Sequence, residues 1–267
     1  MSERTEYAPG EFCWVDLSTT DVDAAKAFYG DLLGIETEAA PGDPEETGGY
    51  GFFMKGGKML AGIGPVQSGE GHSAWSSYVK VEDADATAAK VKEAGGSVFF
   101  GPVDLPNDAG RVAMLRDPTG AFFGVVEQNR NPGAQLVNEP GAWTWNNLMT
   151  RDAAKAKDFY GQVFGWSAVH HDQAPPGVDM WQVEGQHWPE GHAGLMEIGD
   201  DMPAEMPSHW QVYFIVENAD AAIEMAESMG AKLGFGPIDI PVGRLATLVD
   251  PQGAVVSITE AHYPEPR

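Results

Sequence analysis

The residues best suited to acid–base or ligand-binding chemistry occur in two matching sets along the chain. The first set contains Asp16 and Arg111, and the second contains Asn147 and Arg244. A carboxylate can act as a general base and an amide cannot, so only the first set offers that chemistry at its aspartate position. An arginine beside a binding site can clamp a carboxylate or polarise a carbonyl. Asp16 and Arg111 are therefore the catalytic candidates, and Arg244 is a ligand-binding candidate.

A structural role is the alternative for both arginines. Arg111 follows Asp104 closely in the sequence, and Arg244 follows Asp239. Each arginine can therefore form an ion pair that only holds two strands together.

Aromatic residues recur at matching places in the two sets. An apolar, aromatic face with a few polar groups is what a small-molecule pocket needs. Trp75 and Trp210 are assigned to core packing between sheet and helices. The remaining aromatic pairs are the ligand-binding candidates: Trp14 with Trp145, Tyr78 with Tyr213, and Phe100 with Phe235.

These matches belong to an internal repeat that covers most of the chain. Phe28-Tyr29-Gly30 corresponds to Phe159-Tyr160-Gly161, and Asp117-Pro118-x-Gly120 corresponds to Asp250-Pro251-x-Gly253. So many matches in the same order indicate a duplication. The aspartates of the second motif are expected to bond to their own turns.

The repeat predicts two homologous domains, residues 1–131 and 139–267. The linker between them, residues 132–138, contains a Pro-Gly pair, as a domain linker often does. Within each domain, hydrophobic periodicity and glycine stops predict a strand, a helix and further strands, twice over. The prediction is an α+β fold with four βαβββ units. Glu127 and Glu260 end predicted strands and are expected to face solvent.

Composition narrows the classes of partner. The chain has 267 residues, 16 basic and 40 acidic, for a formal charge of −24. Such a chain is a poor partner for nucleic acid or an anionic membrane, which require basic surfaces. The single cysteine, Cys13, excludes an intrachain disulfide and a cysteine-based zinc cage. No apolar run approaches membrane-spanning length and the N-terminus has no signal-peptide core, so a cytoplasmic location is expected.

The chain resembles the vicinal oxygen chelate superfamily, which includes glyoxalase I, bleomycin-resistance proteins and extradiol dioxygenases. The resemblance rests on the helix Asp21–Gly34 with its Phe-Tyr-x-x-x-x-Gly end, on Glu93-Ala94-Gly95-Gly96, and on Asp117-Pro118-x-Gly120. The first and last of these motifs are repeated in the second half. The chain looks most like two-domain actinobacterial proteins of glyoxalase-like or hydroxylase-like type. The resemblance implies tandem glyoxalase-like domains, each a curled mixed sheet whose concave face encloses a cleft.

Metal-using relatives hold a divalent ion in this cleft. Carried over to the first half, the ligand positions fall on Trp14, Ser76 and Gly124, which form no recognisable metal site. In the second half they fall on Trp145, Gln211 and Ser257. An indole cannot ligate a metal. Gln211, with His192 from a neighbouring strand, is a weak candidate pair, so no cofactor is favoured, although a divalent metal in the second half stays open.

Two functions follow from this resemblance. The first is a small-molecule-binding protein with metal-free aromatic clefts, which sequesters an aromatic or oxygenated metabolite. The alternative is a glyoxalase-like or hydroxylase-like enzyme that acts on an oxygenated small molecule, with or without a metal in the second domain. The partner is expected to be a small molecule, and the chain a monomer or a homodimer.

Overall fold

The computed structural model describes residues 3–66, 71–171, 174–175, 177–183, 193–200 and 202–261. It contains two eight-stranded sheets, one in each half of the chain. The first has the order β2-β3-β4-β1-β5-β8-β7-β6 and the second β10-β11-β12-β9-β13-β16-β15-β14. The same order in both sheets confirms the duplication and the α+β fold.

The elements of the first half are β1 (Phe12–Thr19), α1 (Val22–Leu33), β2 (Glu36–Ala39), α2 (Pro44–Thr47), β3 (Gly51–Lys55), β4 (Lys58–Pro65), β5 (Ala74–Val81), α3 (Ala84–Glu93), β6 (Ser97–Asp104), β7 (Gly110–Arg116) and β8 (Phe122–Gln128). Those of the second half are β9 (Trp143–Thr150), α4 (Ala153–Phe164), β10 (Ser167–His170), β11 (Val178–Gln182), β12 (Ala193–Glu197), β13 (His209–Ile215), α5 (Ala219–Ser228), β14 (Lys232–Ile240), β15 (Gly243–Val249) and β16 (Val255–Ala261). None of the described helices is long and apolar enough to cross a membrane.

Local sequence explains where the helices begin and end. Asp21 caps α1, because its carboxylate accepts a hydrogen bond from the backbone N–H of Ala24. Gly34 ends the helix in the left-handed conformation, with φ of 64°, which glycine adopts without a steric penalty. The Glu127 side chain accepts a hydrogen bond from the first backbone N–H of α3. Glu260 does the same for α5, so the two glutamates anchor helices to the sheet rather than simply facing solvent.

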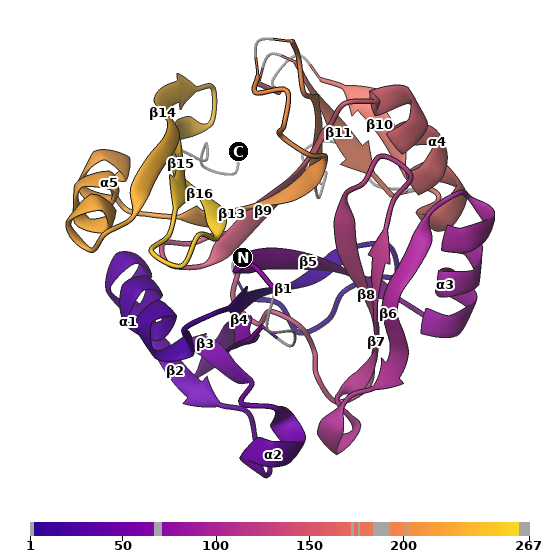
Figure 1. Ribbon diagram of the computed structural model, residues 1–267, viewed down its shortest axis with the longest axis horizontal. Helices are drawn as coiled ribbons and strands as arrows, with labels where there is room; N and C mark the ends of the chain where they lie inside the picture. The colour runs from indigo at the N-terminus through magenta and orange to yellow at the C-terminus, as the bar shows by residue number, and fades with distance from the viewer. Residues whose placement is uncertain are drawn as a thin grey trace.

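The two domains pack back to back (Figure 1). Helix α1 lies beside α5, and α3 lies beside α4. Between these helix pairs, β5 packs against β13, where the Trp75 ring contacts Phe214 at 5.0 Å between centroids. One hydrophobic core therefore runs through both domains, and the two concave sheet faces point away from each other.

Two reciprocal hydrogen-bond chains tie the domains together. Tyr29 of α1 donates to the Asp250 carboxylate of the other domain at 2.8 Å. Tyr160 of α4 donates to Asp117 at 3.0 Å in return. Each phenol also accepts an indole N–H, from Trp75 or Trp210 respectively. The tryptophans are therefore core residues, as expected, and their indole N–H groups are satisfied.

Candidate functional site

Strands β1 and β5, with the residue that precedes β3, bring three polar side chains of the first domain together on the concave face. Asp16 lies on β1, where Gly62 of β4 is its partner on one side and Ser76 of β5 on the other. Its carboxylate accepts hydrogen bonds from the Tyr78 hydroxyl at 3.0 and 3.2 Å and from the Tyr50 hydroxyl at 3.1 Å. Trp14 completes the group by donating its indole N–H to the Tyr50 oxygen at 3.1 Å.

Glycines make the space that this cluster needs. A Cβ atom at Gly62 would lie 1.8 Å from the Tyr50 hydroxyl, and one at Gly124 would lie 2.1 Å from the Tyr78 ring. Neither separation is physically possible without displacing the tyrosine. The glycine at position 124, one of the carried-over ligand positions, is therefore what allows Tyr78 to reach Asp16.

Burial sets the acidity of the cluster. The Asp16 residue is 8% exposed. Burial raises the pKa of its carboxyl from 3.8 to about 6, and the hydrogen bonds from Tyr78 and Tyr50 offset part of that effect. Burial and the nearby Asp16 charge together raise the pKa of both phenols well above 10. The carboxyl is thus the group in this cluster that exchanges a proton near neutral pH.

A row of aromatic side chains crosses the same concave face. Phe100 lies opposite Met114, Met114 opposite Gly124, Gly124 opposite Tyr78, and Tyr78 opposite Trp14. Directly paired residues share one face of a sheet. The structure therefore brings the first-domain ligand-binding candidates together with Asp16, and the Phe100 ring is 53% exposed.

The second domain repeats this row with different polar chemistry. Phe235, Thr247, Ser257, Tyr213 and Trp145 follow one another across it. Next to this row, the Asn147 amide accepts the Trp145 indole N–H at 2.9 Å and donates to the Tyr213 hydroxyl at 3.0 Å.

Arg111 does not join Asp16. It lies on the opposite face of β7, together with the buried Ala113 and Leu115. Its guanidinium pairs with Asp85 of α3 and with Asp104, both at 2.7 Å. These carboxylates raise the pKa of Arg111 further. The structure therefore has the ion pair that the sequence offered as the alternative to a catalytic role.

Arg244 is placed in the same way. It pairs with Asp220 of α5 at 3.0 Å and with Asp239 at 2.8 Å. This residue therefore lies on the helix-covered side of its sheet and away from the second aromatic row. The direction of each side chain follows from strand alternation, because both arginines are an even number of residues from buried core positions.

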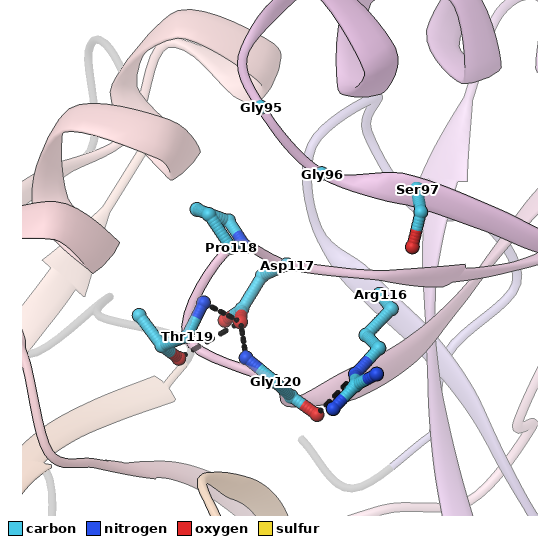
Figure 2. Close-up of a pocket in the computed structure, with 8 residues that line it drawn as sticks. All are labelled: Gly95, Gly96, Ser97, Arg116, Asp117, Pro118, Thr119 and Gly120. Carbon is cyan, nitrogen blue, oxygen red and sulfur yellow. Dashed lines mark hydrogen bonds between the residues drawn. The ribbon is translucent and has the colours of Figure 1, made fainter.

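A separate pocket of about 300 Å³ lies at the turn after β7 and is lined by residues 95–97 and 116–120. Figure 2 shows that the Asp117 carboxylate turns inward toward the backbone of its own turn. One carboxylate oxygen accepts bonds from the N–H groups of Thr119, Gly120 and Ala121, and the other accepts from Tyr160. The aspartate is fully engaged, so we assign this pocket no chemistry.

The residues present do not fit a metal ion in the first domain. Trp14 has no acceptor atom, Gly124 has no side chain, and the Tyr78 ring occupies the space beside it. In the second domain, Gln211 does lie on the concave face opposite Asn147, while His192 lies outside the described residues. No three His, Cys, Asp or Glu side chains gather as metal ligands in the described part of the chain.

The sequence of the chain matches a known family twice. The family model described as "Glyoxalase/Bleomycin resistance protein/Dioxygenase superfamily" matches residues 12–125 and 143–258. The chain belongs to this superfamily.

Among relatives in this superfamily, "Putative glyoxylase CFP32" of Mycobacterium tuberculosis is 40% identical over 265 residues, which are 97% of each chain. "Anthracycline biosynthesis protein DnrV" of Streptomyces peucetius is 34% identical over 273 residues, covering 96% of this chain and 95% of DnrV.

Solved structures in the superfamily share the fold. The Mn(II)-bound glyoxalase from Novosphingobium aromaticivorans has a TM-score of 0.61 at 17% identity, covering 95% of this chain and 83% of that one. The 2,3-dioxygenase LapB from Pseudomonas sp. KL28 has a TM-score of 0.61 at 14% identity, covering 99% and 97%. Identity this low supports the architecture alone. The predicted tandem glyoxalase-like fold is confirmed, and membership supports a small-molecule-binding or glyoxalase-like function.

One member of the site was missed by the sequence reasoning. Tyr50 has no aromatic counterpart in the second half, where Val178 takes the equivalent place beside the β12 glycine. Comparison of the repeats therefore passed over it. The signal that was available is alternation: Tyr50 is two residues from Phe52, which pairs with Gly62 and so shares the Asp16 face.

Proposed function

We propose that this protein binds a small, planar, oxygen-bearing aromatic molecule on the concave face of each domain. The observation that carries the proposal is the aromatic row, Trp14–Tyr78–Phe100 in one domain and Trp145–Tyr213–Phe235 in the other, at the same register of both sheets. Phe100 and Phe235 are each 53% exposed. Exposed rings of this size favour stacking on a flat ligand.

The names of two relatives suggest a class of probe. DnrV and DauV are both named anthracycline biosynthesis proteins, and anthracyclines are polycyclic aromatic ketones that carry hydroxyl groups. A molecule of that kind has a flat apolar body for the rings and polar oxygens for the Asp16 and Asn147 groups. The hydroxyanthraquinone core is therefore a suitable first probe.

The test is a titration with 1,8-dihydroxyanthraquinone, followed by isothermal calorimetry and by the visible absorbance of the dye. We expect Phe100→Ala and Phe235→Ala each to weaken binding several-fold, because a lost stacking contact is worth about 1 kcal/mol. Met225→Ala is the matched control, since Met225 is also an exposed apolar side chain, 45% exposed, but lies on α5. If Phe100→Ala and Phe235→Ala bind the dye as well as the Met225→Ala control and the unaltered protein do, the aromatic rows are not the binding surface.

A second candidate function rests on Asp16. A buried carboxyl with a pKa of about 6 is suited to remove a proton from an oxygenated substrate near neutral pH. The two phenols would hold the substrate oxygen or reorient as the charge on Asp16 changes. The reaction class is proton abstraction next to a carbonyl, as in a glyoxalase-like isomerisation.

This candidate is tested by hydrogen exchange into a hydroxyketone. Hydroxyacetone in D₂O is incubated with the protein, and loss of the α-proton signal is followed by NMR with and without added Zn²⁺, Ni²⁺ or Mn²⁺. We expect exchange to rise with pH around pH 6 and to be lost in Asp16→Asn. Exchange that persists in Asp16→Asn would remove the proposed role of this residue.

A further inference from the structure

The duplicated sites differ at the positions that decide their polarity. Asp16 of the first domain corresponds to Asn147 of the second, because each lies opposite the glycine of the neighbouring parallel strand, Gly62 or Gly194. The first site therefore contains a carboxylate where the second contains an amide. Tyr50 is replaced by Val178 in the same comparison.

In the first site, the Trp14 indole N–H determines the direction of the Tyr50 hydroxyl hydrogen. The Trp14 indole can only donate, so the Tyr50 oxygen accepts from it and the Tyr50 hydrogen is directed to Asp16. Tyr78 also directs its hydrogen to the carboxylate. The first site thus presents an anion with both hydroxyl hydrogens already committed to it, and the ligand meets a group that accepts.

In the part of the chain that the structure describes, no basic side chain pairs with this anion. The neighbours of Asp16 are Trp14 on β1, Tyr50 before β3, Gly62 on β4, and Ser76 and Tyr78 on β5. Asp16 takes part in no ion pair among the described residues. Buried carboxylates are normally paired with a positive charge. A cation supplied by the ligand would complete the site.

Aromatic rings surround the same carboxylate. Trp14 contacts Phe52 with 6.1 Å between ring centroids, and Tyr50 contacts Phe52 at 5.8 Å. Both pairs are edge-to-face. An ammonium group that reaches Asp16 would lie close to these rings, and an aromatic face attracts a cation. The charge of −24 on the whole chain acts in the same direction, because it raises the local concentration of cations.

The second site has the opposite preference. The Trp145 indole donates to the Asn147 carbonyl oxygen, which fixes the amide so that its NH₂ group donates to the Tyr213 oxygen. The hydrogen of Tyr213 is therefore not used by Asn147. Ser257, which is paired with Tyr213 in the sheet, is the other polar group beside this hydroxyl. A ligand that carries a carbonyl oxygen can accept the Tyr213 hydrogen in place of Ser257.

We propose that the duplication has produced two sites of opposite polarity: the first domain binds the ammonium group of an aromatic amine, and the second binds the carbonyl oxygen of a neutral aromatic ketone. The inference rests on the proposed binding function and specifies the ligand class of each site. One molecule with both groups is not required, because the two concave faces point away from each other (Figure 1).

The experiment uses two probes at pH 8, benzyltrimethylammonium and acetophenone, titrated by NMR into the full chain. We expect one cation per chain, with its affinity reduced at least tenfold in Asp16→Asn and unchanged in Tyr213→Phe. The affinity for acetophenone should fall several-fold in Tyr213→Phe and should be unchanged in Asp16→Asn. Asn147→Asp should raise the number of bound cations from one to two.

A further variant separates the rings from the charge. Phe52→Leu keeps Asp16 and should weaken the cation several-fold while leaving acetophenone unaffected. Equal affinity of the cation for the unaltered protein and for Asp16→Asn would overturn the inference while leaving the proposed function intact. Failure of both probes to bind the unaltered protein would overturn the inference and count against the proposed function.

Discussion

At the residue scale, the proton of Asp16 links the site to the stability of the fold. The pKa of this carboxyl is higher in the folded protein, about 6, than its ordinary 3.8. The folded state therefore binds the proton more tightly than the unfolded state, and this favours folding below pH 3.8. The contribution is lost as the pH rises through 6.

Asp16→Asn removes that dependence. Relative to the unaltered protein, the variant should gain stability as the pH rises from 4 to 8, by about 2.5 kcal/mol for a raised pKa of this size. Urea unfolding of both proteins at several pH values measures the difference, and subtracting the two curves cancels the other carboxylates. A difference that stays constant with pH would contradict the raised pKa.

The glycines under the two tyrosines give a second residue-scale prediction. Gly124→Ala places a Cβ atom where the Tyr78 ring now lies, so the ring must move and its bond to Asp16 is lost. Overpacking of this kind costs about 1–3 kcal/mol. Gly30→Ala is the control, because its Cβ would meet only an ordinary contact of 3.4 Å within a helix.

Denaturant unfolding of these two variants decides the matter. We expect a lower midpoint for Gly124→Ala and an unchanged or slightly higher midpoint for Gly30→Ala, since alanine favours helix. Equal midpoints would mean that Tyr78 accommodates the extra methyl group without leaving Asp16.

At the scale of elements, Tyr29 of α1 and Tyr160 of α4 make equivalent hydrogen bonds between the domains. Tyr29→Phe leaves the Asp250 oxygen and the Trp75 indole without this partner, and Tyr160→Phe does the same for Asp117 and Trp210. Loss of a buried hydrogen bond to a charged group costs about 1.5–3 kcal/mol. Both variants should therefore be destabilised by similar amounts, measured by urea unfolding.

The double variant tests whether the two contacts are independent. Separate networks that share no partner should give additive losses of stability. A loss in the double variant well below the sum would show that breaking one contact already releases the other.

The same elements show what the sequence could and could not predict. Strand and helix positions were readable, because apolar periodicity and glycine stops are local signals. The helix expected over Asp21–Gly34 is α1, which runs from Val22 to Leu33. The Phe-Tyr-Gly and Asp-Pro-x-Gly motifs were read as separate family marks. Their true relation, one motif bonding the other across the domain boundary, depends on packing that no single segment encodes.

The candidate site was predicted in part for similar reasons. The row of Trp14, Tyr78 and Phe100 followed from the repeat, and its shared face is now seen. Arg111 was placed with Asp16 although alternation with the core residues Ala113 and Leu115 already pointed it to the helices. Gln211 lies on the concave face as the alignment implied, while any role as a ligand stays a prediction.

At the scale of the whole molecule, the net negative charge of both halves lowers the stability of the folded protein. The two halves, residues 1–135 and 136–267, carry net charges of −11 and −13, and they share one core. Like charges on a compact body repel one another, and salt screens that repulsion. Raising NaCl from about 20 to about 300 mM should therefore increase the melting temperature by several degrees.

Differential scanning calorimetry across a salt series measures this. Because one core spans both domains, the melting transition should remain single at every salt concentration. Two resolved transitions would indicate that the halves unfold independently in spite of their shared core.

The reciprocal tyrosine–aspartate contacts also constrain how such a gene can change. Each half supplies a tyrosine hydroxyl that donates to the aspartate of a turn in the other half. Each half therefore depends on the other to satisfy that buried carboxylate. A recombination event that joins one half to a foreign partner must bring a matching tyrosine and a matching turn at the same time. The residues at the contact between the domains must therefore change together in both copies. The concave faces take no part in these tyrosine–aspartate contacts, so their residues can change independently.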